Sequence, residues 1–184
     1  MGDVTSLIAQ AREGDRSAFD RLFELLYPEL RKIAHARLTR NVRDVLIDTT
    51  ALVNECYMKL VRSERLRAGE REHFLGYAAT VMRSIIVDAA RAAQTDRRGG
   101  GVGHVPLDTE ISDATPNAED EILDVNAALQ QLALIDPRLV RVVEMRYFGG
   151  MSDPEIAEVL GLTDRTVRRD WEKARLLLAN ALRG

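Results

Sequence analysis

Residues 152–178 contain two short helical patterns separated by a single glycine, and this arrangement constrains the fold more than any other part of the chain. Ser152 and Glu155 have the spacing of a capping box, which predicts the start of a helix. Gly161 suits the left-handed residue that ends such a helix, and Thr163 can cap a second one. The spacing therefore predicts a helix-turn-helix.

The second helix of this pair is amphipathic, with a buried seam that repeats every three or four residues. The seam residues are Val167, Trp171, Ala174 and Leu178. The basic residues that fall off the seam are Arg165, Arg168, Arg169 and Lys173. From residue 163 onwards, six Lys or Arg stand against three Asp or Glu, an excess typical of a surface that approaches phosphate. We interpret the motif as a DNA-binding unit. The alternative is a structural hairpin with a solvated basic face.

Charge is distributed unevenly along the 184 residues. The formal net charge is −3, yet residues 96–124 alone carry two basic and eight acidic groups, so the flanking parts are mildly basic. No apolar run approaches membrane-spanning length. The single cysteine, Cys56, excludes an intrachain disulfide and favours a reducing compartment. We predict a cytoplasmic protein that makes no membrane contact.

The sequence contains no pattern typical of an enzyme active site. A phosphate-binding glycine loop before a helix, a nucleophile elbow and a pair of metal ligands are all absent. The glycine run at 99–103 follows two arginines rather than a strand, and His35, His73 and His104 are scattered. Cys56 lies within an apolar helical pattern, which predicts a buried, unreactive thiol. We predict no catalysis, no metal and no cofactor.

Helical periodicity runs through the N-terminal part, and strand-like alternation is nowhere sustained. We expect helices at about 15–38, 49–62 and 71–93, after a short one near Leu7. Pro28 lies inside the first of these long helices and is expected to kink or interrupt it. The predicted fold class is all-α.

The helical pattern stops at residues 96–121, which hold four Gly, two Pro and many acids. That composition is typical of a flexible linker. We therefore expect two helical domains, residues 1–95 and 122–184, joined by this acidic segment. Two further helices, at 122–135 and 137–147, would precede the helix-turn-helix and make the second domain a four-helix unit.

The layout and three local motifs resemble a bacterial RNA polymerase sigma factor of the extracytoplasmic-function (ECF) group, in the sigma-70 family. The stretch LVNECYMKL (52–60) is similar to the helix of sigma domain 2 that binds the polymerase clamp. The stretch HFLGYAATVMRSIIVDAAR (73–91) is similar to the helix that opens and reads the downstream promoter element. Residues 135–175 look like sigma domain 4. The order of all three motifs carries the resemblance.

The resemblance implies a transcription initiation factor that binds core RNA polymerase and directs it to promoter DNA. Domain 4 would read the upstream element in the major groove, where arginines can contact guanine edges or phosphates. Its candidate residues are Thr163, Asp164, Arg165, Thr166, Arg168, Arg169 and Lys173. Domain 2 would melt and read the downstream element, with candidates Tyr77, Arg83, Ser84, Asp88 and Arg91. Ser84 stands where Asn is usual and Tyr77 where Trp is usual, so the downstream base preference stays open.

The expected polymerase-binding surface departs from the family pattern. An acidic Asp-Ala-Glu-Asp run usually precedes the LVxE stretch and pairs with arginines on the polymerase clamp. Here Asp48 is followed by Thr49, Thr50 and Ala51, so two carboxylates are absent. The remaining candidates for core-polymerase binding are Asp48, Asn54 and Glu55.

Thr50, or alternatively Thr49, is the candidate phosphorylation site. A phosphothreonine carries about −1.5 to −2 charges at pH 7, close to the two missing carboxylates, and a helix N-terminus favours an anion. This hypothesis predicts a Ser/Thr protein kinase as a partner, with control by an anti-sigma factor as the alternative. The simpler interpretation is that Asp48 or Thr49 caps the helix and Thr50 is a first-turn residue. The competing function is a stand-alone helix-turn-helix regulator that acts without core polymerase.

Overall fold

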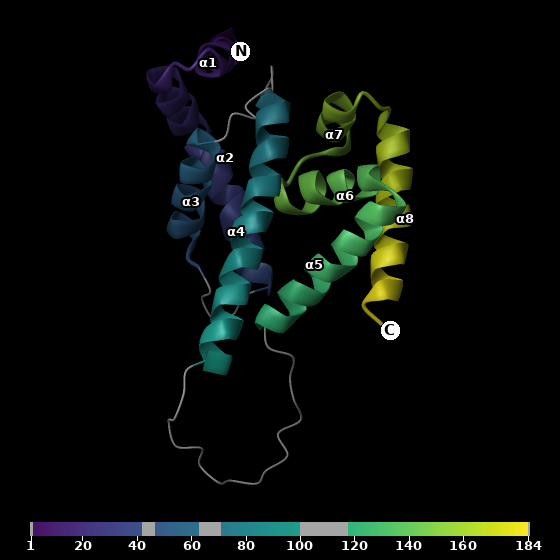
Figure 1. The fold of residues 1–184 in the computed structure, drawn as a ribbon. Coiled ribbons are helices and arrows are strands. Elements are labelled where there is room, and N and C mark those ends of the chain that lie inside the picture. The colour runs from purple at the N-terminus through teal and green to yellow at the C-terminus, as the bar shows by residue number, and fades with distance from the viewer. Residues whose placement is uncertain (1, 42–46, 63–70, 100–117, 184) are drawn as a thin grey trace.

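A computed structural model describes residues 2–41, 47–62, 71–99 and 118–183, and these residues are helical apart from short turns and loops (Figure 1). No strand occurs within these ranges, so the predicted all-α class is confirmed. None of the helices in the described part of the chain combines the length and the apolar character that crossing a membrane requires.

The N-terminal half consists of α1 (Gly2–Arg12), α2 (Arg16–Asn41), α3 (Thr49–Val61) and α4 (Arg71–Gly99). The expected helix at 49–62 is α3, and α4 extends beyond the expected end at residue 93. Three aromatic residues, Phe19, Phe23 and Tyr57, join α2 to α3 through ring contacts. Their apolar area fixes the crossing of these two helices.

The helix α2 continues through Pro28 without a break. Of the two effects expected of this proline, a kink or an interruption, the structure excludes the interruption. Proline removes one backbone hydrogen bond from a helix, but Leu26 and Leu30 on either side of Pro28 are buried in the core. Tertiary packing of this apolar face holds the helix together where local propensity disfavours it.

The C-terminal half consists of α5 (Ala118–Ile135), α6 (Pro137–Val143), the π-helical turn η1 (Glu144–Phe148), α7 (Asp153–Leu160) and α8 (Asp164–Ala181). The helix begins at Pro137 because the Asp136 carboxylate accepts a hydrogen bond from the Arg138 backbone and Pro137 suits a first helical position. The helix expected at 137–147 is thus α6 continued by a wider turn. Such turns are rare and occur frequently at functional sites.

Helical ends extend into the segment that the composition predicts to be a linker. Residues 96–99 belong to α4 and residues 118–121 belong to α5. Three acidic residues occupy the first turn of α5, where negative charge stabilises a helix. The rest of the predicted linker lies outside the described residues.

The helix-turn-helix has the caps that its spacing predicts. The Glu155 carboxylate accepts hydrogen bonds from the Ser152 backbone, at 2.8 Å, and from the Ser152 hydroxyl, at 2.7 Å. Gly161 ends α7 with φ +64°, a left-handed conformation that glycine adopts without strain. Thr163 caps α8 by accepting a hydrogen bond from the Thr166 backbone at 3.3 Å.

The long helix α4 is the centre of the molecule. It contacts α3 on one side, next to α2, and α5, η1 and α7 on the other (Figure 1). Buried apolar side chains form a single cluster that continues from α1 to α8. The two halves therefore share one core and lie side by side, rather than forming two separate bodies.

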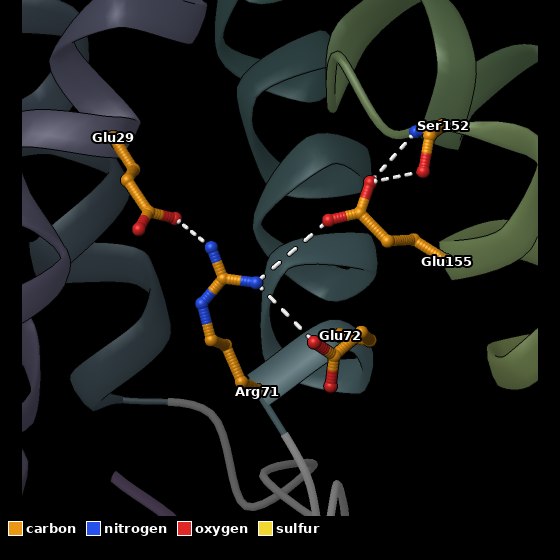
Figure 2. A network of polar contacts seen from close by, with 5 residues as sticks. All are labelled: Glu29, Arg71, Glu72, Ser152 and Glu155. Atoms are coloured by element: carbon orange, nitrogen blue, oxygen red, sulfur yellow. Dashed lines mark hydrogen bonds and ion pairs between the residues drawn. The ribbon is translucent and has the colours of Figure 1, made fainter. Parts of the chain in front are cut away.

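Arg71, at the start of α4, contacts carboxylates from both halves (Figure 2). Its guanidinium lies 2.5 Å from Glu29 of α2, 3.2 Å from Glu72 and 3.8 Å from Glu155 of α7. Hydrogen bonds from the backbone and then the hydroxyl of Ser152, followed by the charge of Arg71, lower the pKa of Glu155 below its ordinary value. The same carboxylate thus caps α7 and touches the N-terminal half.

We expect the charge of Glu155 to stabilise the fold at neutral pH but not in acid. Because folding lowers its pKa, the carboxylate stabilises the folded state above the unfolded value of about 4.3, and this contribution disappears as the pH falls through the lower folded value. The variant Glu155→Gln keeps a residue suited to a capping box but removes the charge. Its free energy of unfolding should be lower than that of the wild type at pH 7, by at most about 1 kcal/mol since the group is partly exposed.

Urea titrations at several pH values measure this difference, which should shrink towards zero below pH ~4. The matched control is Glu172→Gln, which neutralises a carboxylate that is exposed on α8. The control should change the free energy of unfolding little at any pH. A difference for Glu155→Gln that stays constant from neutral to acidic pH would contradict the assignment.

Candidate nucleic-acid interface

The basic face of α8 is open to solvent. The side chains of Arg168 and Arg169 are 69% and 74% exposed, and Arg165 and Lys173 are exposed as well. The seam on the opposite side of α8 is anchored by residues that are fully buried, Val167 and Ala174. This burial fixes the rotation of α8, so the four predicted basic residues share one outward surface.

The three remaining candidates on α8 lie at its N-terminal end. Thr163 and Asp164 are exposed, and Thr166 is half-buried. The hydroxyls of Thr163 and Thr166 are 3.0 Å apart, and Thr163 also caps the helix. These threonines therefore have a structural role in the first turn, independent of any contact with DNA.

Ion pairs fix how α8 lies against its neighbours, and the sequence did not predict them. Asp170 is buried on α8, and one of its oxygens lies 2.8 Å from Nε of Arg138 on α6. Arg146 of η1 lies 2.9 Å from Asp153 of α7, and its guanidinium stacks 4.9 Å from the centre of the Trp171 ring. Buried charges of this kind must be paired, because desolvation is costly.

The signal that could have identified Asp170 is its place on α8. It stands one position before Trp171 and three after Val167, next to the apolar seam, where a carboxylate needs a cationic partner. The identity of that partner could not be predicted, because Arg138 is 32 residues away in the sequence.

The predicted downstream-element residues lie in two different environments on α4. Ser84 and Asp88 contact α3, where Nζ of Lys59 lies 3.2 Å from the Ser84 hydroxyl and 2.8 Å from the Asp88 carboxylate. Arg91 is exposed and lies 4.0 Å from Asp88. By contrast, Tyr77 lines a hollow of about 320 Å³ between α4 and the C-terminal half. The structure therefore does not bring these candidates onto one open surface.

Arg83 also faces the C-terminal half. Its guanidinium donates to the Glu144 carboxylate at 2.5 Å and to Oδ1 of Asn126 at 2.9 Å. The Thr80 hydroxyl donates to the same carboxylate at 3.0 Å. The side chains of Arg83 and Glu144 are only 14% and 10% exposed. The sequence signal for Glu144 was its position inside the apolar run that leads from α6 into η1, where a carboxylate requires a partner.

An apolar cavity of about 330 Å³ lies next to Arg83, between α4, α5, η1 and α8. Its walls include Ile86, Val125, Phe148 and Trp171. Its volume is within the range of sites that take small molecules. Both halves of the molecule contribute to its walls, so the cavity exists only while the halves are packed together.

The N-terminus of α3 is exposed. The Asp48 carboxylate caps α3 by accepting hydrogen bonds from the backbone of Thr50, at 2.8 Å, and of Ala51, at 3.0 Å. The side chain of Thr50 is exposed and that of Thr49 is half-buried. Further along α3, Asn54 and Glu55 are exposed. The capping role expected for Asp48 is confirmed.

Metal-ligating side chains are not gathered anywhere in the described ranges: no group of three or more His, Cys, Asp or Glu residues there could hold an ion. Cys56 is buried on α3, and its thiol lies 4.0 Å from the Ala78 carbonyl oxygen. Loss of solvation raises the pKa of Cys56 to about 12, against a smaller opposing effect of the Lys59 charge. The expected burial of this thiol is confirmed.

Comparison with known proteins identifies one family. The family described as ECF sigma factor matches the chain over residues 1–184. No curated protein matches the chain. The family match includes all three regions described above, namely α3, α4 and the helix-turn-helix.

We expect Cys56 to be unreactive in the folded protein. A thiol reagent such as a maleimide attacks the thiolate, and burial together with a pKa of about 12 leaves almost none at pH 8. Labelling followed by mass spectrometry should be slow for the native protein and complete in denaturant. The matched control is Ser17→Cys, at an exposed position of α2, which should label rapidly without denaturant. Equally rapid labelling of the wild type and this control would contradict the burial.

Proposed function

Because the chain belongs to the ECF sigma factor family, it is a transcription initiation factor that directs RNA polymerase to promoters, and we propose how its two halves divide that work. The C-terminal half reads the upstream promoter element through α8. The N-terminal half binds core RNA polymerase through α3 and reads the melted downstream element through α4. A protein with these partners works in the cytoplasm, and its own chemistry is binding rather than catalysis.

The exposed basic face of α8 is the observation that supports upstream reading. A helix that enters the major groove needs side chains that reach base edges and phosphates without first breaking contacts in the protein. Arg165 and Lys173 meet this condition, because they are exposed on one side of α8. Arg169 is also exposed, and its guanidinium lies 3.9 Å from the Asp170 carboxylate. Arg168 lies 3.5 Å from Asp153, a surface contact that DNA phosphate can replace at little cost.

The exposed start of α3 supports polymerase binding. Asp48, Asn54 and Glu55 present one capping carboxylate, one amide and one free carboxylate on this helix. Arginines on the polymerase clamp would meet fewer negative charges here than the family pattern provides. We therefore propose that the unmodified protein binds core polymerase weakly.

Phosphorylation of Thr50 would supply the missing charge. The Thr50 side chain is exposed in the first turn of α3, whereas that of Thr49 is half-buried, so Thr50 is the more accessible to a kinase. The first turn of α3 contains no acidic residue, and a phosphate there gains from the helix dipole. Arginines on the clamp would bind it through charge-assisted hydrogen bonds. The kinase is thus proposed as a second partner, and an anti-sigma factor remains the alternative means of control.

The salt dependence of promoter binding tests the role of α8. With the holoenzyme, the logarithm of affinity should fall linearly with the logarithm of salt concentration, because DNA binding releases counterions. Removing one phosphate contact by Lys173→Gln should reduce that slope by about one unit. Fluorescence anisotropy with labelled promoter DNA measures the slope. The control Lys32→Gln removes an exposed charge from α2 and should leave the slope unchanged. A wild-type slope in Lys173→Gln would remove Lys173 from the DNA interface.

Run-off transcription with core polymerase tests the proposed switch. The template is the promoter region of the genes neighbouring its own, and the proteins are unmodified wild type, kinase-treated wild type, Thr50→Glu and Thr50→Ala. Kinase treatment should raise transcription of the wild type and leave Thr50→Ala inactive, with Thr50→Glu intermediate because it carries one charge instead of about two. The variant Thr49→Ala is the matched control and should still respond to the kinase.

Two results would change the proposal. Equal transcription from all proteins would keep the sigma factor and discard the phosphorylation switch. Absence of transcription together with absence of core binding would favour the stand-alone regulator, which should shift promoter DNA in a gel without polymerase.

A further inference from the structure

The proposed function assigns no role to the cavity of about 330 Å³ that lies between α4, α5, η1 and α8. We propose that this cavity is a binding site for a small aromatic carboxylate, with the rings of the ligand in the cavity and its carboxylate beside Arg175 of α8. The inference goes beyond the proposed function, because such a ligand needs neither promoter DNA nor polymerase in order to bind.

The cavity has the size and the lining of a small-molecule site. Its volume is about twice that of an apolar cavity of ~150 Å³ that binds benzene, so two fused aromatic rings with a short polar group match it in size. Its apolar walls include Ile86 of α4, Val125 and Leu129 of α5, and Leu178 of α8. The helix α5 runs between α4 and α8 (Figure 1). Water finds few hydrogen bonds among such walls, whereas an apolar ligand loses none.

Three aromatic side chains in the walls favour a ligand that itself contains rings. Tyr147, Phe148 and Trp171 all line the cavity. The rings of Tyr147 and Phe148 meet edge to face, with 5.1 Å between their centres. The guanidinium of Arg146 lies 4.9 Å from the centre of the Trp171 ring. These contacts hold the aromatic walls in place before a ligand arrives, so binding costs little ordering of side chains.

The charged residues around the cavity favour an anionic ligand. Two arginines, Arg83 and Arg175, line the cavity together with one acidic residue, Glu121. A cationic ligand would be repelled by both guanidiniums. It would also have to share the Trp171 ring, the strongest site for a cation on an aromatic wall, with Arg146.

Arg175 is the arginine that a ligand can reach at low cost. Arg83 already donates hydrogen bonds to Glu144 and Asn126. The side chain of Arg175 is 61% exposed, and its guanidinium lies 4.0 Å from Glu172, a surface contact of little energy. Its apolar stem can line the cavity while its charged end stays in water. A carboxylate beside it keeps part of its own hydration, so only the rings of the ligand are desolvated.

Isothermal titration calorimetry of the full-length protein with 2-naphthoate tests the site. We expect one-to-one binding with a Kd of about 1 mM or below, from the affinity that each heavy atom of a small ligand contributes. The neutral analogue 2-naphthylmethanol should bind more weakly, because it has no charge to pair with Arg175. Decanoate carries the same carboxylate on an aliphatic chain and should also bind more weakly, because it makes no contacts between rings.

Two results of these titrations would contradict the proposal. Absence of saturable 2-naphthoate binding would overturn the site. Decanoate binding as tight as that of 2-naphthoate, or tighter, would overturn the aromatic class of the ligand.

Charge variants test where the carboxylate lies. Arg175→Gln should weaken 2-naphthoate binding about two- to fivefold, which is the effect of one exposed ion pair. Glu121→Gln should tighten it, since a like charge leaves the wall. Neither variant should change the affinity for 2-naphthylmethanol. The control Arg12→Gln neutralises an exposed arginine of α1 and should bind both compounds as the wild type does. An unchanged or tighter 2-naphthoate affinity in Arg175→Gln would refute the assignment of the carboxylate to Arg175.

The indole N–H group of Trp171 reports where the ligand binds. Trp171 is the only tryptophan in the sequence, so it gives a single indole signal in a nitrogen–proton correlation NMR spectrum. Ring currents of bound 2-naphthoate should shift this signal in step with the calorimetric saturation. Saturable binding that leaves the signal unmoved would place the ligand elsewhere and overturn the site.

Filling the cavity should remove binding. Val125→Phe places a ring in the cavity from its α5 wall and should abolish both the binding heat and the shift of the indole signal. The matched control Ala127→Phe introduces the same ring at an exposed position of α5 and should bind as the wild type does. Thermal melts followed by circular dichroism establish that both variants are folded. The charge variants change exposed positions, so they test the site even if Val125→Phe does not fold.

The outcome is separable from that of the proposed function. All of these titrations use the free protein, without polymerase or DNA, so a negative result refutes the ligand site alone. Failure of run-off transcription would refute the proposed function and leave the calorimetric result standing.

Discussion

The packing of α4 between the two halves is the constraint on which the rest of the structure depends. Successive residues of this helix face different neighbours, since Ala78 lies against Cys56 of α3 and Ala79 approaches Gly149 beside η1. A helix that is covered on both sides must have small, apolar side chains at its closest contacts. Any polar residue there must find its partner across the interface. Arg83 and Glu144 satisfy that requirement for each other.

The same constraint determines which charged residues are paired within the protein and which are exposed. Charges at interfaces are paired, as Arg138 is with the buried Asp170, because an unpaired buried charge is too costly. Charges left on open surfaces keep their solvation, and Arg165, Arg168, Arg169 and Lys173 of α8 are among them.

Several parts of the structure were predictable because they follow from neighbouring residues. The capping box of Ser152 and Glu155 and the left-handed Gly161 are local devices, and the structure has all of them where the spacing places them. The periodicity predicts a helix over 15–38, but whether it continues through Pro28 depends on the burial of leucines on both sides, which outweighs the local rule for proline. The π-helical turn at the end of α6 has no local signature in the apolar pattern.

The sequence alone determined the helical class, the helix-turn-helix, the family resemblance and the outward basic residues of α8, because caps and helical periodicity act within a few residues along the chain. Only the tertiary structure decided which polar residues are exposed and which are paired within the protein. Arg83 looks like any polar residue of a DNA-reading helix, yet it pairs with Glu144, 61 residues further along the chain. No local pattern encodes that pairing, since it exists only because η1 packs against α4.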